Sequence, residues 1–238
     1  MQKLVFDIET VGENFDALDS KTQEVLTDWI RHEAENDTTY AKELEDLKAG
    51  LGFSPLTGEI VAIGLLDVEK NKGAVYYQAP DAGEKESEEG DIKFKPMTER
   101  EMLESFWRTA NEYDEFVTFN GRMFDVPFLM IRSAIHHIRP TRDLMSNRYL
   151  ESQRGAKHVD LLDQLSFYGA MRVKRGLHMW CRAFGIKSPK EDGVTGDDVN
   201  RLFHEKKFLD IARYNVGDIR STRELYLAWN SYLRNAGR

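Results

Sequence analysis

The chain has 238 residues, of which 41% are hydrophobic and 31% are charged, and its formal net charge at pH 7 is −8. This length and hydrophobic content are enough to fill one sizeable core, so we expect one domain spanning residues 1–238. No apolar run approaches the roughly 18 to 20 residues of a membrane span, and the amino terminus resembles a strand rather than a signal peptide. These features favour a soluble, cytoplasmic protein without a membrane partner. The single cysteine, Cys181, excludes an internal disulfide and a cysteine-rich zinc site.

The charge is unevenly distributed along the chain. Residues 1–119 carry 12 basic and 28 acidic side chains, a net −16, whereas residues 120–238 carry 21 basic and 13 acidic ones, a net +8. Basic and aromatic residues alternate in the second half, as they do on surfaces that follow a nucleic-acid backbone; a solvated helical face is the alternative for any single residue. The basic residues are Arg132, Arg139, Arg142, Arg148, Arg154, Lys157, Arg172, Lys174 and Arg175, interleaved with Tyr149, Phe167 and Tyr168.

The first predicted element is a strand at residues 3–9. Its apolar start predicts burial, and the period of two along a strand places Asp7 and Glu9 on one face, with Ile8 on the other. Residues 20–49 are predicted to be helical, with polar and acidic faces. Residues 60–68 and 74–78 resemble two strands of an antiparallel hairpin, because turn residues separate them. The acidic segment 81–91 is predicted to be a mobile loop without a function of its own.

The next elements alternate between helix and strand. Thr98 and Glu101 form a capping box at the start of a predicted helix, and "EFVTF" at residues 115–119 is predicted to be a strand. A second helix begins near Asp125, with Pro127 in its first turn, where the missing N–H costs little. "HVDLLD" at residues 158–163 predicts a short strand that enters a helix. Further helices are predicted near residues 177–184, 196–204 and 207–234. The resulting order, β-β-β-α-β-α-β-α, indicates an α/β fold.

Four carboxylates in three separate motifs carry the functional prediction. Asp7 and Glu9 lie in "LVFDIET", Asp125 lies in "FNGRMFDVPF", and Asp218 lies in "YNVGD". Tyr214 precedes Asp218 by about one helical turn, so the phenol and the carboxylate share one face of their helix. Clustered acids of this kind are a site for hard divalent cations, because such ions offset the negative charge.

These motifs resemble the DEDDy 3′–5′ exonucleases of the ribonuclease H-like superfamily, most closely the proofreading exonuclease domain of family B DNA polymerases. The resemblance depends on "DIET", on "NGRMFD" at residues 120–125 and on Y-x-x-x-D, in the family's order. It extends to "PLTGEIVAIGL", "HVDLLD" and "FGIKSPKEDGVTGDDV" and covers nearly the whole chain. It implies a stand-alone domain with a mixed central sheet flanked by helices. The segment at about 12–51 matches nothing in the family, and we expect a helical insertion after the first strand.

The resemblance also implies the chemistry and the residues that perform it. Asp7, Glu9, Asp125 and Asp218 would hold two Mg²⁺ ions, for which Mn²⁺ should substitute, with Asp7 as the bridging ligand. Tyr214 would orient the attacking water, so all five residues are predicted to be catalytic. The predicted partner is single-stranded nucleic acid, DNA by preference, with a free 3′ end. Its predicted contacts are Thr10, Val11, Asn120 and Phe124, of which Phe124 could instead belong to the core.

Several alternatives remain at this stage. RNA is an alternative substrate, and a catalytically silent nucleic-acid-binding module is a further one, although the four acids and Tyr214 argue against it. A haloacid-dehalogenase-like phosphatase also begins with an apolar strand and an acid pair, but its second acid is normally Asp and its late acidic motif follows an apolar strand. His158 is predicted to be structural, and Asp160 and Asp163 are predicted to support the site or the fold.

Overall fold

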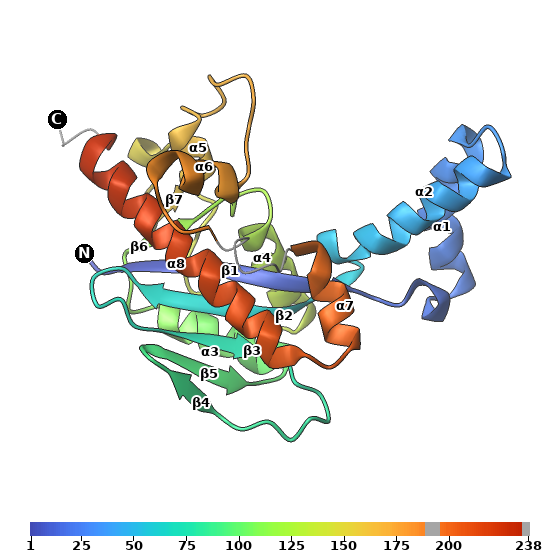
Figure 1. The fold of residues 1–238 in the computed structure, drawn as a ribbon, viewed down its shortest axis with the longest axis horizontal. Helices are drawn as coiled ribbons and strands as arrows, with labels where there is room; N and C mark the ends of the chain where they lie inside the picture. Colours follow the sequence, from blue (N-terminus) through green and yellow to red (C-terminus); the bar gives the residue numbers. More distant parts are fainter. Residues whose placement is uncertain (189–195, 235–238) are drawn as a thin grey trace.

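The structure is a computed structural model that describes residues 1–188 and 196–234, and a mixed seven-stranded sheet lies at its centre (Figure 1). The strand order is β4-β5-β3-β2-β1-β6-β7, with parallel pairs at β3–β5, β1–β6 and β6–β7 and antiparallel pairs elsewhere. This mixed sheet with flanking helices confirms the predicted α/β class. The strands are β1 (Lys3–Gly12), β2 (Gly58–Asp67), β3 (Gly73–Tyr77), β4 (Ser87–Glu89), β5 (Ile92–Pro96), β6 (Glu115–Thr118) and β7 (Lys157–Asp160).

Helices cover both faces of the sheet. One buried cluster joins α3 and α4 to one face, and a second joins α5, α7 and α8 to the other. The long helix α8 crosses the sheet in Figure 1, whereas α3 and α4 lie behind it. The helices are α1 (Ser20–Glu33), α2 (Asp37–Gly50), α3 (Glu99–Ala110), α4 (Asp125–Ile135), α5 (Leu161–Leu165), α6 (Leu177–Phe184), α7 (Val199–His204) and α8 (Phe208–Tyr232).

The central strand β1 divides its side chains between the two cores. Leu4, Phe6 and Ile8 pack into the cluster with α3 and α4. Val5 and Val11 pack into the cluster with α8, so the intervening Asp7 and Glu9 share the α8 face. The predicted alternation is therefore confirmed. The pairing of β1 with β2 shifts register between Glu9 and Thr10, so the strand carries an irregularity directly after the acid pair.

The predicted hairpin at residues 60–68 and 74–78 is confirmed as the antiparallel pair β2–β3. The Thr98–Glu101 capping box is also confirmed, and α3 starts there. The prediction of a continuous loop at 81–91 was wrong, because residues 87–89 form β4. Its three side chains are all exposed, so this edge strand shows no apolar alternation that a sequence pattern could detect. The following β5 adds another strand that the predicted order lacked.

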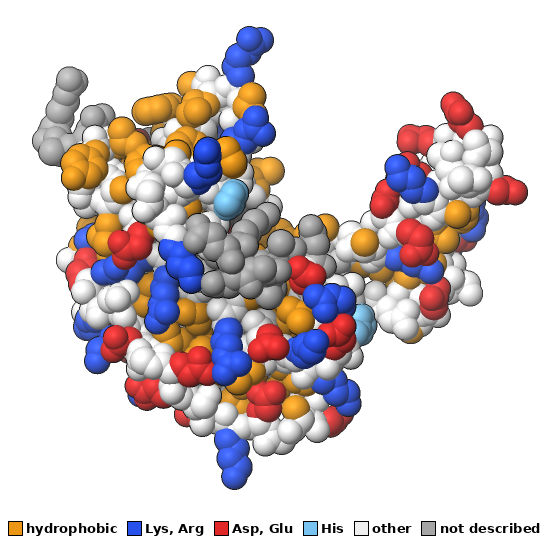
Figure 2. Space-filling model, viewed as in Figure 1, with side chains coloured by type: hydrophobic (Ala, Val, Ile, Leu, Met, Phe, Trp, Pro, Cys, Tyr) orange, Lys and Arg blue, Asp and Glu red, His pale blue; other side chains and the backbone are white. Residues whose placement is uncertain are grey.

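The predicted helical insertion after the first strand is confirmed and consists of two helices. Residues 20–49 were predicted as one helical region, but the helix breaks between α1 and α2, where the side chain of Asn36 caps the second helix. The two helices project from the sheet as an arm (Figure 1), and acidic side chains are prominent on it (Figure 2). None of the α2 residues is fully buried.

The carboxy-terminal helices agree with their predicted positions within a few residues, with a short 3₁₀ turn, Gly196–Asp198, ahead of α7. Part of the "FGIKSPKEDGVTGDDV" resemblance, residues 189–195, falls outside the described residues. Cys181 is buried. Within residues 1–188 and 196–234, no helix combines the length and the apolar character that crossing a membrane requires.

Candidate active site

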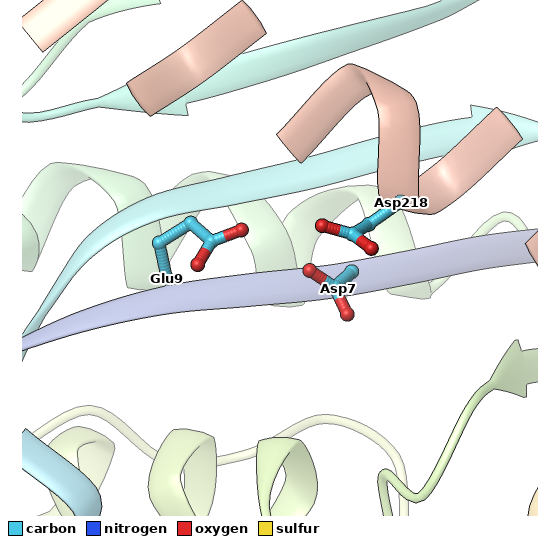
Figure 3. Close-up of side chains that lie close together, drawn as sticks. All are labelled: Asp7, Glu9 and Asp218. Atoms are coloured by element: carbon cyan, nitrogen blue, oxygen red, sulfur yellow. The ribbon is translucent and has the colours of Figure 1, made fainter. Parts of the chain in front are cut away.

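Three carboxylates from two distant parts of the chain converge on the α8 face of the sheet (Figure 3). Asp7 and Glu9 project from β1, and Asp218 reaches them from the middle of α8. One carboxylate oxygen from each lies within 4.8 Å of the others. Among the described residues, this group has the spacing that a bound cation requires.

The cluster brings carboxylates together where Glu9 is buried and Asp7 is half-buried. Burial, together with the neighbouring charges of Asp125 and Asp218, raises the pKa of Asp7 well above its usual value. Burial and the charge of Asp218 raise the pKa of Glu9 in the same way, and a hydrogen bond from Asn215 opposes the shift. Like charges at this spacing repel one another, so a bound cation would stabilise the ionised carboxylates.

Asp125 lies beside the cluster at the start of α4. Its Oδ1 accepts a hydrogen bond of 3.1 Å from the backbone N–H of Ile8, between the two acids of β1. The parallel pairing of β1 with β6 ends at Val5 and Val117, so that pairing does not use the Ile8 N–H. Burial raises the pKa of Asp125 to about 7. Asp125 is thus near enough to affect Asp7 electrostatically, but it is not a member of the 4.8 Å group.

Tyr214 lies one turn before Asp218 on α8 and is hydrogen-bonded to it. The ring is half-buried and packs against the core beneath α8. Burial and the charges of Asp218 and Glu9 raise the pKa of the phenol far above its usual value. The hydroxyl therefore stays protonated and can donate a hydrogen bond, but it is a poor base.

The four predicted substrate contacts lie in different environments. Thr10 donates its hydroxyl to the Gly52 carbonyl at 2.7 Å, and the Val11 side chain is buried, so the backbone of this pair is the part left for a ligand. Asn120 has a left-handed φ of 66° at the end of β6. Phe124 is half-buried and lies 5.3 Å from Phe128 and 6.5 Å from Phe53 between ring centroids.

The residues of "HVDLLD" support the loop that leads to Asp125. Asp160 accepts hydrogen bonds from the backbone N–H groups of Asn120 and Arg122, at 2.9 and 3.0 Å. This contact holds Asn120 in its left-handed conformation. His158 is buried between Thr118 and the Leu144 carbonyl, and burial lowers its pKa to about 4, which fits a neutral structural histidine. Asp163 accepts two hydrogen bonds from Arg148.

Fewer of the predicted basic residues are available to phosphates in the structure than the sequence suggests. Arg132 forms a two-pronged ion pair with Glu99, and Arg142 donates to the carbonyls of Ala110 and Asn111. Arg148 binds Asp163, and Lys157 binds the carbonyls of Leu150 and Gln153. These four cations stabilise the fold because their partners lie in the protein. Exposed cations remain at Arg139, Arg154, Arg172, Lys174 and Arg175.

Asn215 is a site residue that sequence reasoning missed. Its Nδ2 lies 2.8 Å from Asp7 Oδ2 and 3.2 Å from Glu9 Oε1. Its position between Tyr214 and Val216 gives no signal of this, because the contact depends on how α8 lies over β1. The group of Asp7, Glu9 and Asp218 fits a divalent cation, since carboxylate oxygens are the ligands such ions prefer.

Comparison with known proteins shows which family matches the chain. The family of predicted 3′–5′ exonucleases related to the exonuclease domain of PolB matches residues 58–235, which include Asp125, Tyr214 and Asp218 but not Asp7 or Glu9. No curated protein matches the chain. The chain is similar in structure to the family B DNA polymerase from the hyperthermophilic archaeon Pyrobaculum calidifontis, with a TM-score of 0.60 and 18% identity.

That similarity covers 97% of this chain and 24% of the polymerase, so the chain spans about a quarter of the polymerase's length. It shows that the mixed sheet and its helices form a ribonuclease H-like fold. The family match covers well over half of the chain. The chain therefore belongs to the family of predicted 3′–5′ exonucleases related to the exonuclease domain of PolB.

Proposed function

We propose that residues 1–238 form one catalytic domain that removes nucleotides from the 3′ end of single-stranded nucleic acid, with DNA as the preferred substrate. The convergence of Asp7, Glu9 and Asp218 within 4.8 Å, on the α8 face of a ribonuclease H-like sheet, is the observation that carries this proposal. The family match supplies the direction of cleavage. The proposal extends the family's general activity to a definite set of residues.

Asp7, Glu9 and Asp218 would hold two Mg²⁺ ions, for which Mn²⁺ can substitute, and Asp125 would complete the set from α4. Bound divalent cations supply a nucleophile at neutral pH and stabilise charge on the leaving oxygen in phosphodiester hydrolysis. Burial and mutual repulsion raise the pKa of Asp7 and Glu9, and bound divalent cations would offset both effects. The raised pKa of Asp125, about 7, reflects the cost of charging this carboxylate in the metal-free site.

Tyr214 would position the attacking water. Its hydroxyl is fixed by the hydrogen bond to Asp218, and the raised pKa of the phenol keeps its proton in place. A protonated hydroxyl at the edge of the acid cluster can orient a water without removing its proton. This division of tasks, in which the carboxylates bind the cations and the phenol orients the water, supports the DEDDy assignment.

The nucleic acid would approach through contacts on both sides of the acids. The backbone of Thr10 and Val11, the turn at Asn120 and the ring of Phe124 are the proposed contacts at the 3′ end. Exposed cations at Arg172, Lys174 and Arg175 would attract the phosphates. An aromatic ring suits a single strand, because stacking on an unpaired base does not depend on its identity.

Matched 5′-labelled DNA and RNA single strands test the proposal. With Mg²⁺, the expected result is a ladder that shortens from the 3′ end of the DNA, with slower loss of the RNA. A strand blocked at its 3′ hydroxyl should resist. Faster loss of the RNA would reassign the substrate, and no loss of either strand with Mg²⁺ or Mn²⁺ would favour a silent binding module. Hydrolysis of a small phosphomonoester instead would favour the phosphatase.

A further inference from the structure

The side chain of Asn215 lies between α8 and the acids of β1. Its amide nitrogen donates to Asp7 Oδ2 at 2.8 Å and to Glu9 Oε1 at 3.2 Å. The residue is completely buried, with 0% relative exposure. A primary amide has two N–H donors, so Asn215 can give one to each carboxylate. It is the hydrogen-bond donor that joins the two acids of the first motif.

The orientation of this amide is determined by the acids. The Asn215 Oδ1 atom is buried and has no hydrogen-bond partner among the described residues. Leaving an acceptor unpaired costs free energy, so the side chain keeps this orientation at the expense of stability. The reversed orientation would direct Oδ1 at two carboxylates, which have no proton to donate when they are ionised. The Nδ2 group of Asn215 therefore faces Asp7 and Glu9.

The space for Asn215 comes from a glycine on the neighbouring strand. Gly64 of β2 lies directly opposite Asp7, and Ala62 lies opposite Glu9. Side chains of directly opposed residues share one face of the sheet, so the missing side chain at 64 leaves a gap next to Asp7. A Cβ atom there would lie 1.9 Å from Asn215 Oδ1 and 3.0 Å from Asn215 Cγ. No residue larger than glycine can occupy position 64 while Asn215 keeps this place.

We propose that Asn215 is a positioning residue that holds Asp7 and Glu9 at the separation the cations require, and that Gly64 provides the gap in which it sits. The inference deepens the proposed function and rests on it. A glutamate side chain has several rotatable bonds, and the carboxylates of Asp7 and Glu9 repel each other when both are ionised. A hydrogen bond from a fixed donor would keep the Glu9 carboxylate in one position. Hydrogen bonds to metal-ligating carboxylates serve this purpose in metal sites generally.

The first experiment compares Asn215→Ala with the wild type and with Asn230→Ala, which removes an asparagine near the end of the same helix. Mn²⁺ affinity is measured by titration calorimetry without substrate, and the cleavage rate in single turnovers. We expect Asn215→Ala to lose about 10- to 100-fold in Mn²⁺ affinity or rate. Its melting temperature should stay close to the wild type, because the unpaired Oδ1 is removed as well. Asn230→Ala should match the wild type in affinity and rate.

The second experiment tests the gap, and it applies even if Asn215→Ala does not fold. Gly64→Ala should weaken Mn²⁺ binding although position 64 supplies no metal ligand, because the added methyl displaces Asn215. In the Asn215→Ala background, the same change should have little further effect on affinity. Independent losses that multiply would overturn the link between the two residues. The Ile219 side chain, 3.0 Å from the added Cβ, would affect stability in both backgrounds alike.

The outcomes separate this inference from the proposed function. If the wild type binds Mn²⁺ and cleaves DNA, and Asn215→Ala does both equally well, Asn215 is a packing residue and the inference fails alone. If the wild type neither binds Mn²⁺ nor cleaves, the proposed function fails. Weaker Mn²⁺ binding in Asn215→Ala, with an unchanged fold, supports the positioning role.

Discussion

Two buried acid sites in this protein are built in opposite ways. Glu99, at the start of α3, accepts hydrogen bonds from Arg132, His136 and the backbone N–H of Ile60. Burial alone would raise its pKa, but these partners lower it below its usual value. In the cluster of Asp7, Glu9 and Asp218, burial and mutual repulsion raise the pKa of the two acids of β1, and the neutral amide of Asn215 only partly opposes this.

The difference supports the proposal that the acid cluster is the functional site. At Glu99 the chain supplies its own cation, so the ion pair is complete in the folded protein. Glu115 is similar, since it is fully buried and binds Arg234 and Tyr226. In the cluster on β1 and α8, burial and the neighbouring carboxylates instead raise the pKa of Asp7 and Glu9, so a bound divalent cation would stabilise the ionised form of these two acids. The comparison predicts opposite effects of mutation at the two kinds of site.

The largest expected effect is on catalysis. Asp7→Ala and Asp125→Ala should each lower the single-turnover rate with Mg²⁺ by about 10³-fold or more, because each removes a proposed metal ligand. Without metal, the melting temperature of Asp7→Ala should stay the same or rise, since a like charge is removed. In Asp125→Ala the loss of the acceptor for the buried Ile8 N–H opposes that gain. Glu88→Gln, on the exposed strand β4, serves as the control. Full activity of either purified mutant would remove that residue from the site.

Glu99→Ala should lower stability and leave catalysis nearly unchanged, the opposite of the changes at Asp7 and Asp125. It leaves the partly buried Arg132 without its ion-pair partner, so the free energy of unfolding should fall by about 3–5 kcal/mol. The cleavage rate of the folded fraction should stay close to that of the wild type. Urea denaturation and single-turnover kinetics measure the two quantities. A loss of activity at unchanged stability would contradict the division between the ion-paired Glu99 and the acids of the proposed metal site.

The pH dependence of stability should differ in sign at the two sites. The pKa of Asp125 rises from 3.8 in the unfolded chain to about 7 in the fold, so its contribution to metal-free stability is lost as pH rises through this range. Each pH unit of that interval corresponds to about 1.4 kcal/mol. Asp125→Asn should remove the part of this dependence that Asp125 contributes, leaving that of Asp7 and Glu9, and Mg²⁺ should stabilise the wild type at pH 8 in thermal melts. For Glu99, whose pKa is lowered, stability is instead lost at acidic pH.

Tyr214→Phe refines the comparison within the cluster. The change keeps the ring in the core but deletes the hydroxyl that binds Asp218. The single-turnover rate should fall by about 10- to 1000-fold, the effect of one lost positioning hydrogen bond, while Mn²⁺ affinity changes little. Tyr232→Phe, at an 86% exposed residue of the same helix, is the control. A rate equal to that of the wild type would leave the metal site intact but refute the DEDDy assignment.

The smallest expected effect concerns exposed cations for which the described residues show no ion pair. Charge reversal at Arg172, Lys174 and Arg175 should flatten the salt dependence of single-stranded DNA binding, measured in the Asp7→Ala background. Each phosphate contact contributes a slope of about −0.7 in log K against log salt, so up to about two units could be lost. Charge reversal at the ion-paired Arg201 is the control. An unchanged slope would place the strand on another surface.

The sequence by itself determined the local geometry of the site. The period of a strand places Asp7 and Glu9 on one face, and one helical turn joins Tyr214 to Asp218. The hairpin β2–β3 and the capping box of α3 also follow from local patterns. These features depend on residues close together in the chain, so their physical causes can be read from it directly.

Only the tertiary structure decided which side chains are left free and which are already paired. Arg132 looked like a phosphate contact in the sequence, but packing of α4 against α3 pairs it with Glu99. Asn215 showed no pattern, because its function requires α8 to lie over β1 and Gly64 to lie opposite Asp7. Such contacts join residues far apart in the chain, and their energies depend on burial and strand register, which exist only once the chain has folded.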